Sequence, residues 1–440
     1  MFAMVHGKEH SERKRMLSHV YSKTQVLSSA TTRETTEAIL YQRLLPIFQN
    51  SSDTDSAVEV LELNYAYAMD TFMAFQFGLS LASNFIQDIQ KRKWYLNDFF
   101  SRRPYLFYIT ETPKLLSRLA KVGLHIVPQW VDAATDALES WNLDICDRAE
   151  HLLAQDREIP AVDYPVIYAQ ERAAMRKSYP GTTRLNTPRQ DQSYPFRYEI
   201  ASDMYDHNAA AHETSGDTLT YVYYEMSRNP VLQKRLRDEL LTLNPPVAFP
   251  LADPGAIILA DFKAVDGLPL LDAILMETLR LWVAVPGGQP RLTPYPSCSI
   301  AGYDNIPPNT KVQCYAYALH RNPKVYEEPE EWKPERWLDA SAEKLTEMRR
   351  WFWAFGSGGR MCIGNNIAIH CESTLVSLSP ICHHRRKDDA NKAVSAMKMA
   401  IAGIYTNFTS EIFEHGDMTL ADGFTAGPKG NRLNLKFKHV

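Results

Sequence analysis

The sequence predicts a mainly α-helical fold with a minor β part, and three observations lead to this prediction. Apolar residues recur at three- and four-residue spacing through most of the first 170 positions, which is the period of an amphipathic helix. One helical pattern is long and runs from Arg197 to Ser227. Short alternating runs lie between Val285 and Tyr317 and at the C-terminus. The 440 residues suffice for one large domain or two of medium size.

Composition and charge exclude several classes of protein. The chain has 48 basic and 52 acidic side chains, a formal charge of −4, so no global positive field is available to hold nucleic acid. The six cysteines are dispersed, which indicates a reducing compartment rather than a secreted disulfide scaffold. There is no run of about 18 apolar residues, and the first fifteen positions are already charged. We therefore expect neither a membrane-spanning helix nor a signal peptide.

Several amphipathic helices are expected from about Lys8 to Gln170. Proline lacks an N–H and interrupts this pattern at Pro46, Pro104 and Pro128. Residues 180–195 are rich in Pro, Ser, Thr, Arg and Gln, a composition that predicts a surface loop.

The helix from Arg197 to Ser227 is expected to end before Pro230. At 1.5 Å per residue it is on the order of 45 Å long, enough to cross a whole domain. The remaining pattern predicts helices at 231–243 and 268–282 and strands at 298–300, 311–315 and 433–437.

The strongest chemical signal is the ten-residue segment Phe355-Gly356-Ser357-Gly358-Gly359-Arg360-Met361-Cys362-Ile363-Gly364. Its glycines let the backbone turn tightly and approach a flat ligand. A cysteine placed just before a helix is favoured as a thiolate, the form that ligates iron. The alternative is a glycine-rich turn beside a buried cysteine.

This segment resembles the haem-binding loop of the cytochrome P450 family, because it matches Phe-x-x-Gly-x-Arg-x-Cys-x-Gly at every fixed position. The resemblance implies that Cys362 is the axial ligand of the iron in haem b. It also implies that Arg360 meets a carboxylate at the edge of the haem, and that Phe355, Gly356 and Gly364 belong to the cofactor-binding set.

Two further elements follow the order of that family. Glu277 and Arg280 form a Glu-x-x-Arg pair on one helix face, and Arg336 lies in Pro-Glu-Arg-Trp. By itself such a pair is more often a solvated surface feature. The resemblance instead assigns these three residues to a buried charge network that holds the thiolate loop in place.

The helix pattern at 210–215, Ala-Ala-His-Glu-Thr-Ser, resembles the oxygen-activation motif of the family. The resemblance implies that Glu213 and Thr214 organise water and deliver protons, whereas the plain alternative is an alanine-rich helix. Ala211 stands where glycine is usual, which predicts a slightly tighter groove over the iron. Arg291, His10 and Lys14 fall where the family places further propionate partners, although a solvated basic run is an equal alternative for the last two.

The resemblance covers the whole chain, with two departures. Family members carry roughly a hundred residues before the basic helix, so we expect residues 1–440 to form a single haem domain without the N-terminal anchor and first strands. Residues 371–396 interrupt the family spacing, and we expect an intron-derived insertion there. A zinc site from Cys371, Cys382, His383 and His384 is disfavoured because adjacent histidines rarely bind one ion.

The resemblance implies a haem-thiolate monooxygenase that oxidises a hydrophobic small molecule with dioxygen. Electrons would come from NADPH through NADPH-cytochrome P450 reductase, at the cytosolic face of the endoplasmic reticulum membrane. Phrases of the sequence look like filamentous-fungal members that make secondary metabolites, including mycotoxins. Substrate contacts are expected at 206–210, 284–289 and 424–427. The alternatives are a catalytically impaired haem-binding relic, a haem-thiolate isomerase, dehydratase or peroxide-using enzyme, and a haem sensor.

Overall fold

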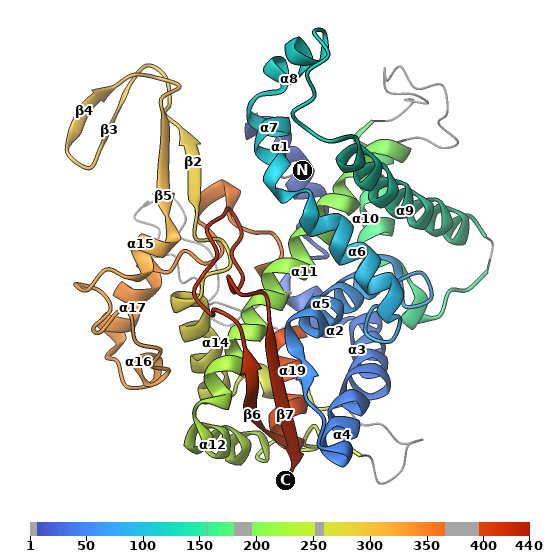
Figure 1. The fold of residues 1–440 in the computed structure, drawn as a ribbon, viewed down its shortest axis with the longest axis vertical. Helices are drawn as coiled ribbons and strands as arrows, with labels where there is room; N and C mark the ends of the chain where they lie inside the picture. Colours follow the sequence, from blue (N-terminus) through green and yellow to red (C-terminus); the bar gives the residue numbers. More distant parts are fainter. Residues whose placement is uncertain (1–6, 156, 180–195, 251–258, 366–395) are drawn as a thin grey trace. The chain divides into compact units, whose positions relative to one another are not determined.

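The computed structural model describes residues 7–155, 157–179, 196–250, 259–365 and 396–440 (Figure 1). Within them the chain is mostly helical with three small sheets, which confirms the predicted fold class. The chain divides into two compact units. Unit 1 comprises Met1–Val20, Ala30–Thr35 and Met69–Ala211, and unit 2 comprises Tyr21–Ser29, Thr36–Ala68 and His212–Val440. Two long helices contribute to both units, α5 (Val60–Phe77) and α11 (Arg197–Ser227).

Unit 1 is built from helices that pack around aromatic side chains. Phe85, Tyr95 and Trp141 lie with ring centroids 5.3 to 5.9 Å apart where α6 (Ile89–Ser101) meets α9 (Gln129–Ala154). The buried carboxylate of Asp70 accepts the N–H groups of Phe85 and Ile86 and so fixes the turn before α6. The other elements are α1 (Gly7–Leu17), most of α3 (Ala30–Glu37), α7 (Arg103–Glu111), α8 (Pro113–Ala120), a 3-10 turn (Ala161–Asp163) and α10 (Val166–Ser178).

Pro104, Pro128 and Pro230 mark helix boundaries as predicted, whereas the interruption predicted at Pro46 is absent, because helical structure continues from a π-helical segment (Ala38–Leu44) directly into α4 (Leu45–Thr54). Pro104 and Pro113 lie in the first turns of α7 and α8, and Pro128 caps α9. Pro230 begins a new helix after α11 has ended at Ser227. Proline terminates one helix and starts another because it lacks an N–H donor and its φ angle is already helical.

Unit 2 has a core formed by α14 (Pro269–Leu281) and α19 (Ala396–Asn407), both buried over most of their length. Lys398 is buried in α19, and its Nζ lies 2.8 Å from a carboxylate oxygen of Asp266 and of Asp272. The remaining helices are α2 (Lys23–Ser28), a π-helical segment (Ala38–Leu44), α4 (Leu45–Thr54), α12 (Pro230–Leu240), α13 (Phe262–Asp266), α15 (Ala316–His320), α16 (Glu335–Leu338), α17 (Ala342–Trp351) and a 3-10 turn (Gly358–Arg360).

All strand pairs in the described sheets are antiparallel. The three-stranded sheet has the order β1-β7-β6, with β1 (Val58–Glu59), β6 (Phe408–His415) and β7 (Leu433–His439). Two hairpin-like pairs follow α14: β2 (Gly288–Leu292) with β5 (Lys311–Tyr315), and β3 (Cys298–Ile300) with β4 (Tyr303–Ile306). Strands were thus correctly expected at 298–300, 311–315 and 433–437.

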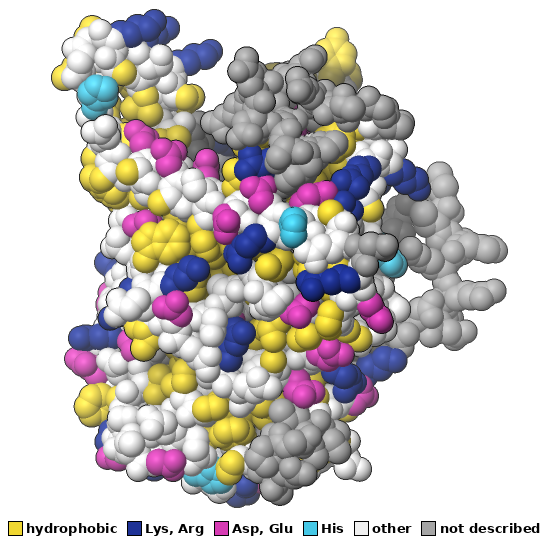
Figure 2. Space-filling view, turned by 90° about the vertical axis from the view of Figure 1, so that its right-hand side faces the viewer, with side chains coloured by type: hydrophobic (Ala, Val, Ile, Leu, Met, Phe, Trp, Pro, Cys, Tyr) yellow, Lys and Arg dark blue, Asp and Glu magenta, His cyan; other side chains and the backbone are white. Residues whose placement is uncertain are grey.

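Two properties of the described residues concern binding to membranes and to charged partners. None of the helices that the structure describes combines the length and the apolar character needed to cross a bilayer. On the face drawn in Figure 2, basic and acidic side chains are interspersed, as the near balance of charges in the sequence leads us to expect.

Candidate functional site

The glycine-rich loop, residues 355–364, follows α17, and backbone hydrogen bonds hold it in a turn that ends at Cys362. The Cys362 N–H donates to the Phe355 carbonyl at 2.9 Å, and the Gly356 N–H donates to the Trp353 carbonyl at 3.0 Å. Gly356 and Gly358 have φ angles of +69° and +70°, a left-handed conformation that side chains with a Cβ rarely adopt. The turn leaves the Cys362 side chain exposed, which argues against the alternative of a buried cysteine.

Two guanidinium groups are found at this loop, that of Arg360, which belongs to the loop itself, and that of Arg291. The Arg291 side chain, from β2, donates from Nη2 to the Ser357 carbonyl at 3.0 Å. The pKa of Arg360 lies below its ordinary value. The main cause is partial burial of its guanidinium group, and the second is the positive charge of nearby Arg291. Two like charges held together favour a ligand that carries carboxylates. The residues present therefore fit a haem: a sulfur for the iron, glycines for close approach, and two cations for the propionates.

Two segments of unit 2 that are far apart in sequence, 284–289 and 424–427, meet beside the loop. Gln289 donates from Nε2 to the Trp353 carbonyl at 3.3 Å. The Ala426 N–H donates to the Ala284 carbonyl at 2.9 Å, so 284–289 and 424–427 lie side by side. The structure thus brings two of the three segments expected to contact substrate together at the loop. The third, 206–210, belongs to unit 1.

Helix α11 contacts segment 424–427 just after Glu213 and Thr214. Glu213 is buried and Thr214 is half-buried, and the Thr218 hydroxyl donates to the Thr214 carbonyl at 2.8 Å. Three residues beyond Thr214, the carboxylate of Asp217 accepts from the Tyr65 hydroxyl at 2.6 Å. It also fills the space beside Gly427, because a Cβ there would stand 2.3 Å from Asp217 Oδ1. The helix is continuous through this region.

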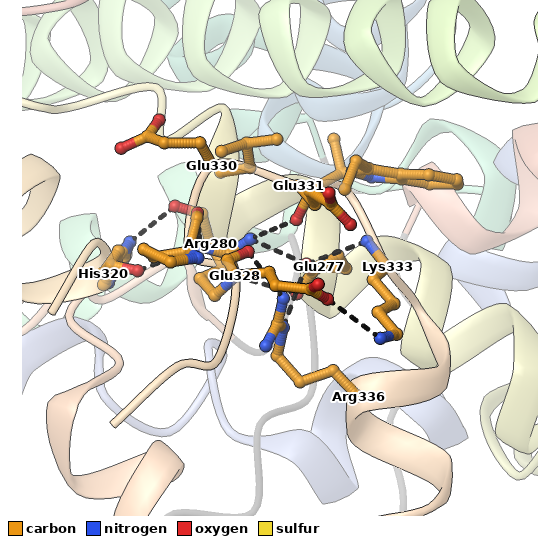
Figure 3. Close-up of polar contacts among 12 residues, drawn as sticks. Glu277, Arg280, His320, Glu328, Glu330, Glu331, Lys333 and Arg336 are labelled. Carbon is orange, nitrogen blue, oxygen red and sulfur yellow. Dashed lines mark hydrogen bonds and ion pairs between the residues drawn. The ribbon is translucent and has the colours of Figure 1, made fainter. Parts of the chain in front are cut away.

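The structure brings Glu277, Arg280 and Arg336 together in one buried network (Figure 3). Arg280 donates from Nη2 and Nε to the two Glu277 oxygens at 2.7 and 2.9 Å, and Arg336 Nε lies 3.2 Å from Oε1. The Glu277 and Arg280 side chains are 0% exposed. The Lys333 N–H and the Trp337 indole also donate to Glu277, so the charges of this network all have partners.

One residue without a predicted role, His320, connects this network to the loop, and Gln289, expected there only as a substrate contact, supports the same loop segment. His320 lies between Arg280 and Trp353, and Gln289 donates to the Trp353 carbonyl. The only sequence signal for His320 is its position in His-Arg-Asn-Pro, ahead of the stretch that contains Arg336. Their contacts depend on tertiary structure, which a motif does not encode.

The two predicted propionate partners near the N-terminus lie in unit 1. His10 is buried and Lys14 is half-buried, both on α1. Their neighbour Arg13 pairs with the buried carboxylates of Glu171, at 3.5 Å, and Asp203, at 3.3 Å. Because Cys362 belongs to unit 2, the roles of His10 and Lys14 stay predictions.

The predicted insertion at 371–396 lies outside the described residues except for Ala396, where α19 begins. The four residues of the disfavoured zinc alternative, Cys371, Cys382, His383 and His384, lie outside them as well.

Comparison with known proteins gives one family and several relatives. The family model for cytochrome P450 matches residues 2–378. The chain is similar to the cytochrome P450 monooxygenase avaI of Aspergillus versicolor, 26% identical over 85% of this chain and 82% of the relative. It is also similar to the cytochrome P450 monooxygenase BOT1 of Botryotinia fuckeliana, 36% identical over 41% of this chain. A third relative is the mitochondrial cholesterol side-chain cleavage enzyme of Hypanus americanus, 32% identical over 40% of this chain. The last two matches each span 30% of the relative.

Proposed function

This chain belongs to the cytochrome P450 family of haem-dependent monooxygenases, and from that premise we propose that Cys362, Arg360 and Arg291 hold the haem. The observation that carries this assignment is the loop that exposes the Cys362 side chain next to two guanidinium groups. When bound, the haem supplies the chemistry that activates dioxygen, so that one oxygen atom enters the substrate and the other becomes water.

Three sets of side chains of this chain have separate roles around the haem. The Cys362 thiolate would hold the haem iron, and thiolate ligation would supply the electron density that favours O–O cleavage. The Glu213 carboxylate and the Thr214 hydroxyl order water and pass protons to the site. The buried network of Glu277, Arg280 and Arg336 stabilises the conformation of the loop and takes no part in the chemistry.

The substrate class follows from the segments that adjoin the loop. Residues 284–289 and 424–427 are mostly apolar or small, which suits a hydrophobic small molecule. Two of the relatives named above are monooxygenases of filamentous fungi, and we place this chain in fungal secondary metabolism, of the kind that produces mycotoxins.

Electrons would come from NADPH through NADPH-cytochrome P450 reductase, at the cytosolic face of the endoplasmic reticulum membrane. Residues 1–440 would form one haem domain, interrupted at 371–396. The isomerase and dehydratase alternatives need no external electrons, so turnover without NADPH would favour them over a monooxygenase.

The test is a carbon monoxide difference spectrum of the reduced, hemin-supplemented protein. We expect a thiolate-type Soret band that Cys362→Ser abolishes and that Cys314→Ser, a half-buried cysteine in β5, leaves unchanged. Protein that stays colourless, or a spectrum that Cys362→Ser does not alter, would contradict the assignment. A wild-type chain without the band would support the haem-binding relic.

A further inference from the structure

We propose that His320 is a positioning residue that transmits the order of the Glu277–Arg280 network to the Cys362 loop. Its imidazole ring bridges two backbone segments, one on α14 and one at the start of the loop. The role of the loop as an iron-binding site rests on the proposed function, but the bridge itself is a property of the chain.

One ring nitrogen of His320 faces a hydrogen-bond donor, and the other faces an acceptor. The Trp353 N–H donates to Nε2 at 2.8 Å, and Nδ1 lies 3.0 Å from the Arg280 carbonyl. Because an amide only donates and a carbonyl only accepts, Nε2 must be unprotonated and Nδ1 must carry the proton. His320 is therefore held as one neutral tautomer, with both nitrogens in use.

The surroundings fix the plane of the ring. His320 is fully buried, and it stacks on Phe352 with ring centroids 5.2 Å apart and an interplanar angle of 10°. The His320 carbonyl accepts from Arg280 Nη1 at 2.9 Å, so the backbone and the side chain of this histidine both contact Arg280. Burial lowers the pKa of His320 to about 3, which keeps the ring neutral at physiological pH.

A continuous series of hydrogen bonds leads from this ring to the cysteine. Trp353 donates to His320 through its N–H and accepts from Gly356 through its carbonyl at 3.0 Å. The carbonyl of the intervening Phe355 accepts from the Cys362 N–H at 2.9 Å. Loss of the bond to His320 would release Trp353 at the point where the loop begins, and the constraint on Cys362 would weaken with it.

The experiment measures amide hydrogen exchange in the full-length, haem-free chain, resolved to peptides covering 353–362. In His320→Asn the shorter side chain keeps a donor near the Arg280 carbonyl but does not reach Trp353. We expect exchange in these peptides to rise about tenfold, the change that corresponds to the loss of one net hydrogen bond. In His320→Gln an oxygen replaces Nε2 as acceptor, and we expect exchange within about threefold of wild type.

Tyr326→Phe is the matched control. It removes one buried hydrogen bond in the same neighbourhood, from the Tyr326 hydroxyl to the Met348 carbonyl at 2.8 Å, without touching the loop. We expect it to leave exchange at 353–362 unchanged. Equal effects of His320→Asn and Tyr326→Phe on these peptides would overturn the proposal. Should His320→Asn not fold, the wild-type Trp353 amide decides: exchange as slow as in α14 supports the bridge, and exchange as fast as in an unstructured peptide refutes it.

A second readout follows the ligand itself. In hemin-supplemented protein we expect His320→Asn to lose part of the thiolate-type band, and His320→Gln to restore it. If wild type shows no such band, the proposed function fails while the exchange pattern still tests the bridge. If wild type shows the band and both variants match it, the role of His320 toward Cys362 is refuted.

Discussion

Replacing Glu277 by glutamine tests the buried charge network most directly. The Glu277 carboxylate accepts from two Arg280 nitrogens, from Arg336, from the Lys333 N–H and from the Trp337 indole. Glutamine keeps the shape but removes the negative charge. It also points an NH₂ group at donors, so that two guanidinium groups lose their counter-charge in the interior.

The expected loss is large because the Glu277 and Arg280 side chains are inaccessible to water. Removing one partner of a buried ion pair costs about 3 to 5 kcal/mol. A domain has about 5 to 15 kcal/mol of stability in total, so Glu277→Gln should remove a large share of it. We expect the denaturant midpoint to fall steeply, measured by the fluorescence of the tryptophans in the haem-free chain.

Glu335→Gln is the control for this experiment. Glu335 pairs with Arg235 at 2.5 Å, but both side chains are substantially exposed, and such pairs contribute about 0 to 1 kcal/mol. If Glu277→Gln costs no more than Glu335→Gln, the argument that the network stabilises the fold through charge compensation is refuted.

Three further changes have defined outcomes. Gly427→Ala places a Cβ 2.3 Å from Asp217 Oδ1, so we expect the unfolding free energy to fall by about 1 to 3 kcal/mol, and an unchanged denaturant midpoint would show that the contact yields without cost. Arg291→Gln removes one of the two guanidinium groups beside the loop, and we expect hemin titration to show about tenfold weaker binding; equal affinity would exclude Arg291 as a propionate partner. Burial holds the pKa of His320 at about 3, below its ordinary 6.5, so the unfolded chain takes up a proton there that the folded chain does not. Its stabilisation is complete above about pH 6.5 and is lost as the pH falls; between pH 7 and pH 5, wild type should lose stability more steeply than His320→Gln, by up to about 1.4 kcal/mol per pH unit, and parallel curves would contradict this.

Local signals in the sequence predicted much of the fold. Helix α11 was predicted from Arg197 to Ser227, and the structure gives the same bounds, because Pro230 provides a stop that depends on no distant contact. Strands β1 and β6 were missed. β1 has two residues, and it exists only because Val58 pairs with Leu435, far away in the sequence. Such a strand has no period that a local reading could detect.

The candidate site divides in the same way. Cys362 and Arg360 were found because their spacing within ten residues carries the chemistry. His320 was given no role, and Gln289 was expected to contact substrate rather than to support the loop, since each forms a hydrogen bond to the backbone of Trp353, which lies 33 and 64 residues away. A hydrogen bond to a backbone group demands no particular residue at the other end, so nothing in the sequence of the loop points back to its support.

The close contact between Tyr65 on α5 and Gly216 on α11 also limits how this protein can be re-engineered. A Cβ on Gly216 would stand 2.4 Å from Tyr65 Cδ1, and a Cβ on Gly427 would collide with the Asp217 carboxylate. Mutagenesis libraries aimed at new substrate preferences should therefore keep both glycines fixed. Diversity belongs at exposed neighbours such as Phe424, where a new side chain has room without displacing a helix.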